Sequence, residues 1–257
     1  AFFQAHAAQA RVIMDEHLQA AAVSLHSPAE LAEMQSGNIS TLEAADGGAL
    51  IADEHERLEA SFRNPKAVRN RIARACDGLP EDILALVRTV RDRVCQDRLP
   101  LLTLLQSDPL QMQSSHLSFQ EFYAARALQS GAFLLPPAAS EPWRWSAWWS
   151  NTLRLGAEMG ASFAHGLLAS LGSASTSRIE HGLDIRARIA GDRPTALQAI
   201  GILLKIMQAA DLRDNRFESL SDVQELAQVI REAGSSCVHL SLAGNAFGVE
   251  GVEELCS

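Results

Sequence analysis

Apolar residues recur at helical spacing along most of the chain. Between residues 2 and 26 they stand among many alanines, which predicts one long helix because alanine costs least in a helix. Residues 79–97 show an amphipathic pattern whose apolar face is formed by Ile83, Leu84, Val87, Val90 and Val94. Further helices are predicted at 28–36, 49–62, 65–75 and 195–208. The chain is therefore expected to be mainly α.

Two short segments interrupt the helical pattern and lead into another helix. Residues 99–105 are nearly all apolar, and residues 110–114 fit a short strand. Residues 115–126 then begin a helix. Ser118 and Glu121 have the spacing of a capping box, in which each side chain bonds the backbone N–H of the other residue. We expect this pair to fix the start of the helix.

The C-terminal part of the chain contains one pattern twice. Residues 210–217 match residues 240–247, and their asparagines, Asn215 and Asn245, are 30 residues apart. A period near 30 with the pattern L-x-L-x-x-N-x-F is typical of leucine-rich repeats, in which a short strand precedes a helix. The two asparagines are expected to hydrogen-bond backbone groups that the turns leave unpaired.

The same pattern predicts which residues face a partner. Parallel strands are expected at about 210–212 and 238–242, with their leucines pointing inward. Because side chains alternate along a strand, Arg213, His239 and Ser241 are expected on the exposed face. This face is the predicted site for protein partners.

Residues 115–126 resemble the H-L-S-F-Q-E-F-x-A-A motif that closes the winged-helix domain of NACHT-type nucleotide-switch proteins, the NOD-like receptor group. The C-terminal repeats, which resemble the ribonuclease-inhibitor type, agree with this resemblance. It implies a winged-helix-like region at 79–130, a helical domain at 131–190 and incomplete leucine-rich repeats at 191–257. The expected fold is therefore helical domains with a small winged helix, followed by the start of an α/β solenoid. Residues 1–78 are predicted to be helical and match no part of the family.

The resemblance also implies a function. In the family, the winged and helical domains hold a closed state and the repeats recognise partners or restrain activation. The histidine before the motif contacts the phosphates of ADP in an upstream domain, and His116 occupies this position. The alternative for His116 is a structural histidine bonded to a backbone carbonyl. Ser114 and Ser115 depart from the family, which usually has apolar or aromatic residues there.

Sequence motifs of catalysis are missing. The chain has no G-x-x-x-x-G-K-[ST] phosphate loop, so ADP or ATP is expected only in an upstream domain and no cofactor is expected in this chain. It also has no H-E-x-x-H metal motif and no G-x-S-x-G nucleophile motif, so we assign no catalytic residue and no metal. The chain is predicted not to be an enzyme. The alternative is a helical enzyme whose site has no recognised motif.

Charge argues against a nucleic-acid partner. The net charge is -9, which disfavours binding to phosphate backbones. Between residues 63 and 98, nine basic residues outnumber five acidic ones, so a winged-helix DNA-binding protein is kept as a further alternative. A solvated helix face explains this local excess more simply, because charged runs are common on helices.

Composition completes the expectations. The four cysteines are far apart and form no Cys-x-x-Cys pair, which suits a reducing compartment such as the cytoplasm. No uncharged apolar stretch reaches the length of a membrane span. Trp145, Trp148 and Trp149 fall at helical spacing, which favours core packing over a stacking or sugar-binding platform. We interpret the chain as a fragment of a longer signalling protein.

Overall fold

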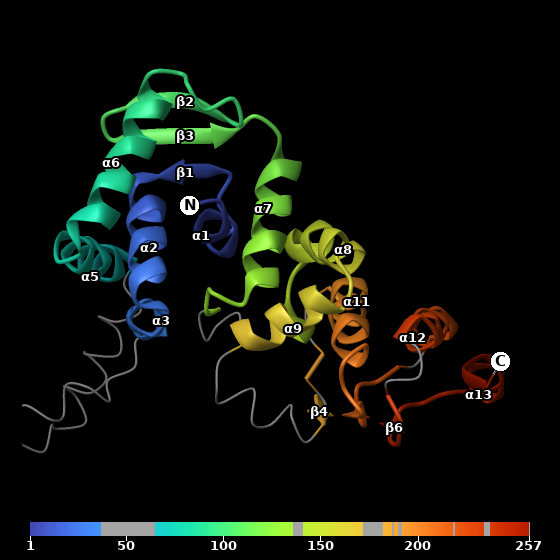
Figure 1. The fold of residues 1–257 in the computed structure, drawn as a ribbon. Helices are drawn as coiled ribbons and strands as arrows, with labels where there is room; N and C mark the ends of the chain where they lie inside the picture. Colours follow the sequence, from blue (N-terminus) through green and yellow to red (C-terminus); the bar gives the residue numbers. More distant parts are fainter. Residues whose placement is uncertain are drawn as a thin grey trace, which may run out of the picture. The chain divides into compact units, whose positions relative to one another are not determined.

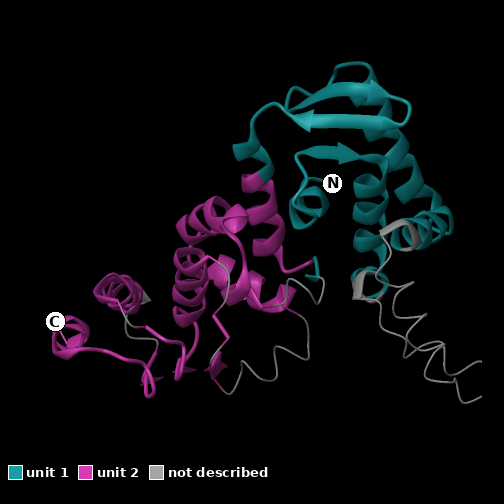
Figure 2. Cartoon of the chain, turned by 180° about the vertical axis from the view of Figure 1, so that it is seen from behind, with its two compact units in different colours: residues 1–120, 133–138 teal, residues 121–132, 139–257 magenta. Residues whose placement is uncertain are grey.

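The computed structural model describes residues 1–36, 65–135, 141–171, 182–186, 188–189, 192–217, 219–233 and 237–256. These residues are mainly helical, as the apolar spacing predicts. The chain divides into two compact units, residues 1–120 with 133–138 and residues 121–132 with 139–257 (Figure 2). The helix predicted at 49–62 lies outside the described residues.

The first unit combines helices with a three-stranded antiparallel sheet (Figure 1). Its helices are α1 (Phe2–Ala7), α2 (Asp15–His26), α3 (Pro28–Ser36), α5 (Pro65–Asp77) and α6 (Glu81–Cys95), and α7 (Leu117–Ser130) begins in it. Its strands are β1 (Val12–Met14), β2 (Leu102–Ser107) and β3 (Leu110–Ser114). They lie in the order β1-β3-β2, so β3 is the central strand.

Helix α6 packs its predicted apolar face against two hydrophobic clusters. Val90 and Val94 join the cluster around the sheet, in which Ile13 and Met112 are fully buried. The N-terminal half of α6 packs against a second cluster formed by α2, α3 and α5. The amphipathic pattern of α6 is therefore confirmed, and its burial of aliphatic side chains ties the helices to the sheet.

The prediction of one helix over residues 2–26 is wrong. Helix α1 ends at Ala7, and Gln9 has a left-handed backbone with φ of 53°. Val12 and Ile13 then form a strand, with Val12 opposite Gln113 in β3. Pairing with a strand about a hundred residues away overrides local helix preference, and β-branched residues suit the strand. A region expected to be helical therefore supplies one edge of the sheet.

The second unit begins in α7 and alternates helices with short strands. Its first elements are the 3₁₀ turns η2 (Pro142–Arg144) and η3 (Ala147–Trp149), then α8 (Ser150–Glu158) and α9 (Ala161–Ser170). The later ones are β4 (Leu183–Asp184), α11 (Arg193–Leu204), β5 (Ala209–Asp211), α12 (Leu220–Ala233), β6 (His239–Ser241) and α13 (Val249–Cys256).

The tryptophans lie in the core, as expected, but not on a helix. Trp145 and Trp149 are buried and stack with ring centroids 4.3 Å apart, while Trp148 is half-buried. Trp145 and Ser146 have extended backbones and separate the two 3₁₀ turns, which prevents a continuous helix. The prediction of core packing is confirmed, and the prediction of one helical face is wrong.

The capping box predicted for Ser118 and Glu121 is not formed. Helix α7 begins at Leu117, so Ser118 lies inside the first turn instead of before it. The Glu121 side chain is buried, and its carboxylate accepts a hydrogen bond from the Asn151 amide in α8. A buried carboxylate needs a hydrogen-bond donor. Asn151 supplies it from another helix, so the sequence around Glu121 gives no sign of this bond.

A parallel sheet in the order β4-β5-β6 organises the C-terminal part of the second unit. Ala210 of β5 lies opposite Leu240 of β6, so the predicted parallel pairing of these two strands is confirmed. Leu183 of β4 lies opposite Ala210 on the other side. Strand β4 falls inside residues 131–190, which were expected to be helical, so the strand pattern begins earlier in the sequence than predicted.

Candidate binding surface

The exposed face of the parallel sheet carries charged residues in register. Leu183 and Ala210 are buried, so the neighbouring side chains Asp184 and Asp211 point to the opposite face. Ser241 stands beside Asp211 in the next strand. The three strands thus present a row of two carboxylates and one hydroxyl on one face.

Two arginines hold the carboxylates of this row. The Arg213 guanidinium donates to both oxygens of Asp211, at 2.9 Å from Nε and 2.6 Å from Nη2. The Arg186 Nε lies 3.2 Å from Asp184 and 3.4 Å from Asp211. Hydrogen bonds from Arg186 and Arg213 lower the pKa of Asp184 and of Asp211 below their usual values. We call these four residues the charged ladder.

The three residues predicted to contact a partner lie as follows. Arg213 carries its side chain on the exposed face, but its guanidinium is engaged by Asp211. His239 is exposed and Ser241 is half-buried, and both line a hollow of about 510 Å³. Gly182 and Ala209, which have little or no side chain, also line this hollow.

Asn215 ties its own segment to the preceding one. Its Nδ2 donates to the carbonyl oxygens of Ile185 and Arg213, at 3.1 and 3.2 Å. Its Oδ1 accepts from the backbone N–H groups of Arg188 and Ile189, both at 3.1 Å. The side chain is buried and uses both ends of its amide, so it satisfies four backbone groups that would otherwise be costly.

Asn245 makes the same connection one segment later. Its Nδ2 donates to the carbonyl oxygens of Leu212 and Leu242, at 2.9 and 2.8 Å. Its Oδ1 accepts from the Phe217 N–H at 3.4 Å. The prediction that Asn215 and Asn245 hydrogen-bond turn backbone is confirmed. Each also reaches into the turn of the preceding segment, which the sequence pattern alone did not predict.

The turns that position these asparagines share a backbone conformation. Asp214 and Gly244, each one residue before an asparagine, have φ of 58° and 72°. Aspartate and glycine are among the residues that tolerate this left-handed region. At the φ of Gly244 a side chain would be strained, and its Cβ would lie 1.8 Å from the Asp214 carboxylate, so glycine suits the place where the two turns stack. The ring centroids of Phe217 and Phe247 lie 6.3 Å apart beside them.

His116 lies at the surface of the first unit, as expected. It is exposed, it precedes α7, and its ring meets Phe119 edge-on with centroids 5.8 Å apart. A pocket of about 200 Å³ is lined by His116, Arg11 and Gln120, among others. Gln120 is fully buried and donates to the Ala10 carbonyl, while its Oε1 has no partner in the described residues. A cation and a helix N-terminus beside this pocket favour an anionic group.

Sequence reasoning missed Asp184 and Arg186. A signal for them exists, because Leu183-Asp184-Ile185-Arg186 and Ala210-Asp211-Leu212-Arg213 share the pattern of an apolar residue, Asp, an apolar residue and Arg. The first copy lacks the marker asparagine, since Arg188 stands three residues after Ile185 where Asn215 follows Leu212. The asparagine pattern therefore marks only the second and third copies.

The described part of the chain shows no metal site and no membrane-spanning helix. It holds no group of three or more His, Cys, Asp or Glu side chains arranged to bind a metal ion. None of its helices is long and apolar enough to cross a membrane. Comparison with known proteins gives no match to a family model, to a curated protein or to a solved structure.

Proposed function

We propose that this chain is a regulatory and protein-binding segment of a cytoplasmic NACHT/leucine-rich-repeat receptor-like signalling protein, without catalysis of its own. One observation carries the proposal. Consecutive segments follow β4, β5 and β6, and an asparagine at the same position of the second and third segments bonds the turn before it. Such linked strand–helix units are typical of solenoids of leucine-rich repeats.

The arrangement of the strands supports binding of a protein. Successive helices α11, α12 and α13 pack beside one another, which leaves the other face of the strands open (Figure 1). That face carries the charged ladder together with His239 and Ser241. A row of fixed polar groups on parallel strands is suited to recognising a protein surface rather than a small apolar ligand.

The first unit supports the regulatory part of the proposal. Its order of elements, with helices between β1 and a β2–β3 hairpin and with β3 central, is compatible with a winged helix. The pocket at His116 opens beside Arg11 and the N-terminus of α7. We infer that an upstream nucleotide-binding domain places the phosphates of ADP here, so that the nucleotide state controls the closed arrangement.

Site-specific photocrosslinking tests partner binding. A photoreactive amino acid at His239, on the strand face, should join a defined protein partner in cells. The same group at Gln224, exposed on α12, should not join that protein. A crosslinked product that is identical from both positions, or none from His239, would contradict binding through the strand face.

Substitution of His116 tests the regulatory role. In a longer protein that includes the nucleotide-binding domain, His116→Ala should weaken ADP retention by about tenfold or more, because a hydrogen bond to a charged group contributes about 1.5–3 kcal/mol. Thermal unfolding should stay unchanged, since His116 is exposed. Unchanged ADP affinity would eliminate the nucleotide contact and leave the strand-face proposal standing.

A further inference from the structure

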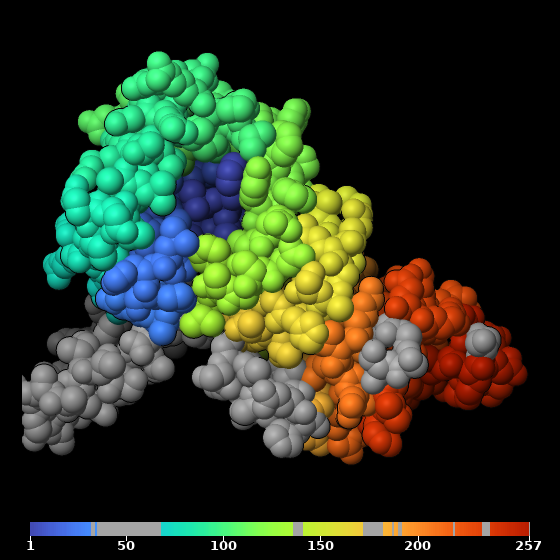
Figure 3. All heavy atoms as spheres, viewed as in Figure 1, coloured from blue at the N-terminus to red at the C-terminus, as the bar shows by residue number. Residues whose placement is uncertain are grey.

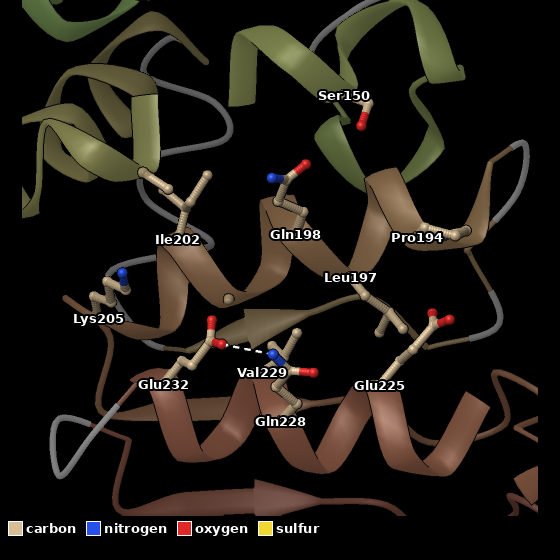
Figure 4. Close-up of a pocket in the computed structure, with 12 residues that line it drawn as sticks. Ser150, Pro194, Leu197, Gln198, Ile202, Lys205, Glu225, Gln228, Val229 and Glu232 are labelled. Carbon is tan, nitrogen blue, oxygen red and sulfur yellow. Dashed lines mark hydrogen bonds between the residues drawn. The ribbon is translucent and has the colours of Figure 1, made fainter. Parts of the chain in front are cut away.

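A groove of about 360 Å³ lies between α8, α11 and α12, on the helical side of the second unit (Figure 4). Leu197 and Ile202 of α11 and Val229 of α12 supply its apolar wall. Gly201 brings the two helices together, because a Cβ at this position would lie 2.8 Å from Val229. A volume of about 360 Å³ lies within the range of binding pockets.

Charged groups stand at both ends of this groove. Figure 4 shows Glu225 near one end and Glu232 with Lys205 near the other. Other charged residues of α12 have ionic partners, since Asp222 lies 3.1 Å from Arg193 and Arg231 lies 3.3 Å from Glu254.

The two carboxylates that face the groove differ from the other charged residues of α12 in their partners. Among the described residues, Glu225 has no basic partner, and Glu232 accepts a hydrogen bond only from Gln228, at 2.9 Å. Two carboxylates and one ammonium group leave the rim of the groove net negative. The charge of the groove is therefore complementary to a basic partner.

We propose that this groove docks an amphipathic helix of a partner protein, with basic residues seven positions apart facing Glu225 and Glu232 and an apolar residue between them facing the apolar wall. Glu225 and Glu232 are two turns apart on one face of α12, a separation of about 10.5 Å. A helix lying along α12 repeats this spacing, and its residues three or four positions further on face the apolar wall. An acidic helix would be repelled by the same carboxylates.

This inference does not depend on the function proposed above. The groove lies between helices and uses none of the charged ladder, His239 or Ser241. Loss of binding at the strand face would leave the groove intact, and blocking the groove would leave the strand face intact. The two sites can therefore be tested separately on the same chain.

The test measures binding of a synthetic peptide to the whole chain by fluorescence anisotropy. The peptide has about 18 residues, long enough to be helical, with lysines seven positions apart and leucines between them. We expect saturable binding that weakens as salt is added. The double variant Glu225→Lys/Glu232→Lys should weaken binding by about tenfold or more, and Ala157→Trp, which fills the groove from α8, should abolish it.

Matched controls separate the groove from general attraction of a basic peptide to an acidic protein. The variant Glu250→Lys/Glu253→Lys makes the same change of charge on exposed positions of α13 and should leave binding unchanged. A peptide with glutamates in place of the lysines should not bind. Equal weakening by both double variants, no saturable binding, or equal binding of the acidic peptide would overturn the proposal.

Discussion

The second and third strand–turn–helix segments follow one sequence pattern but are buried to different extents. In the segment of β5 and α12, Leu212 and Phe217 are fully enclosed. The matching residues of the segment of β6 and α13, Leu242 and Phe247, are only half-buried. Val252 of α13 is 51% exposed, and the atoms of α13 lie at the surface in the space-filling view (Figure 3).

The difference shows that neighbours, rather than the pattern itself, create the core. Strand β5 lies between β4 and β6, and α12 has α11 on one side and α13 on the other. In the described residues, β6 is paired on one side only. A repeat cannot bury its apolar face alone, so within the described residues the matching leucine is core in one segment and edge in the next.

The largest expected effect comes from truncating equivalent leucines. Leu212→Ala should lower the free energy of unfolding by about 2–5 kcal/mol, because it empties an enclosed site. Leu242→Ala should cost less than about 2 kcal/mol, because its side chain is only half-buried. Chemical denaturation of the two variants measures both values. Equal losses would mean that the two segments are equally enclosed.

The second effect concerns the asparagines. Asn215→Ala leaves four backbone groups without their partner and should lower the free energy of unfolding by about 1–3 kcal/mol. Asn245→Ala removes fewer bonds at a more exposed turn, so its loss should be smaller. Thermal unfolding, monitored by circular dichroism, compares the loss of stability in the two variants. A larger loss for Asn245→Ala would reverse the comparison.

The smallest effect is expected for the charged ladder. Its carboxylates end at Asp211, because β6 has Ser241 at the matching position. The pKa of Asp211 is lowered in the folded chain, so this carboxylate stabilises the fold above its unfolded pKa of about 3.8. That contribution is lost as the pH falls through the folded pKa. Asp211→Asn should therefore cost less than about 1 kcal/mol at neutral pH.

Denaturation at pH 7 and at pH 2 tests this prediction. The difference in stability between Asp211→Asn and the unaltered chain should shrink in acid, because protonation of Asp211 removes the same charge that the substitution removes. Ser241→Ala serves as the control, because no carboxylate is removed. A difference that grows in acid would show that the ion pair with Arg213 does not stabilise the fold.

Local signals in the sequence were sufficient to predict much of the structure of the second unit. The spacing of Asn215 and Asn245 indicated both the strands and the role of the amides, because in each turn this side chain donates to a nearby backbone carbonyl. The start of α11 is also fixed locally, since the Asp192 carboxylate accepts from the Thr195 N–H at 3.0 Å. These features depend on residues close in sequence.

Features that depend on distant residues were not predictable in this way. Strand β1 exists because Val12 and its neighbours pair with β3, and the carboxylate of Glu121 is bonded by Asn151 from another helix. Strand β4 was hidden because Arg188 stands where a marker asparagine would have shown the repeat. The first two features depend on a residue far away in the sequence. The third was missed because the residue that marks the repeat is replaced.

Amide hydrogen exchange, resolved by residue with NMR, tests most directly whether the segments are successive copies of one unit coupled through their asparagines. The account predicts slower exchange in β5 and α12 than in β6 and α13. It also predicts that Asn245→Ala speeds exchange of the Phe217 amide, which donates to Asn245 from the preceding segment. Equal protection of α12 and α13, with the Phe217 amide unaffected by the substitution, would contradict it.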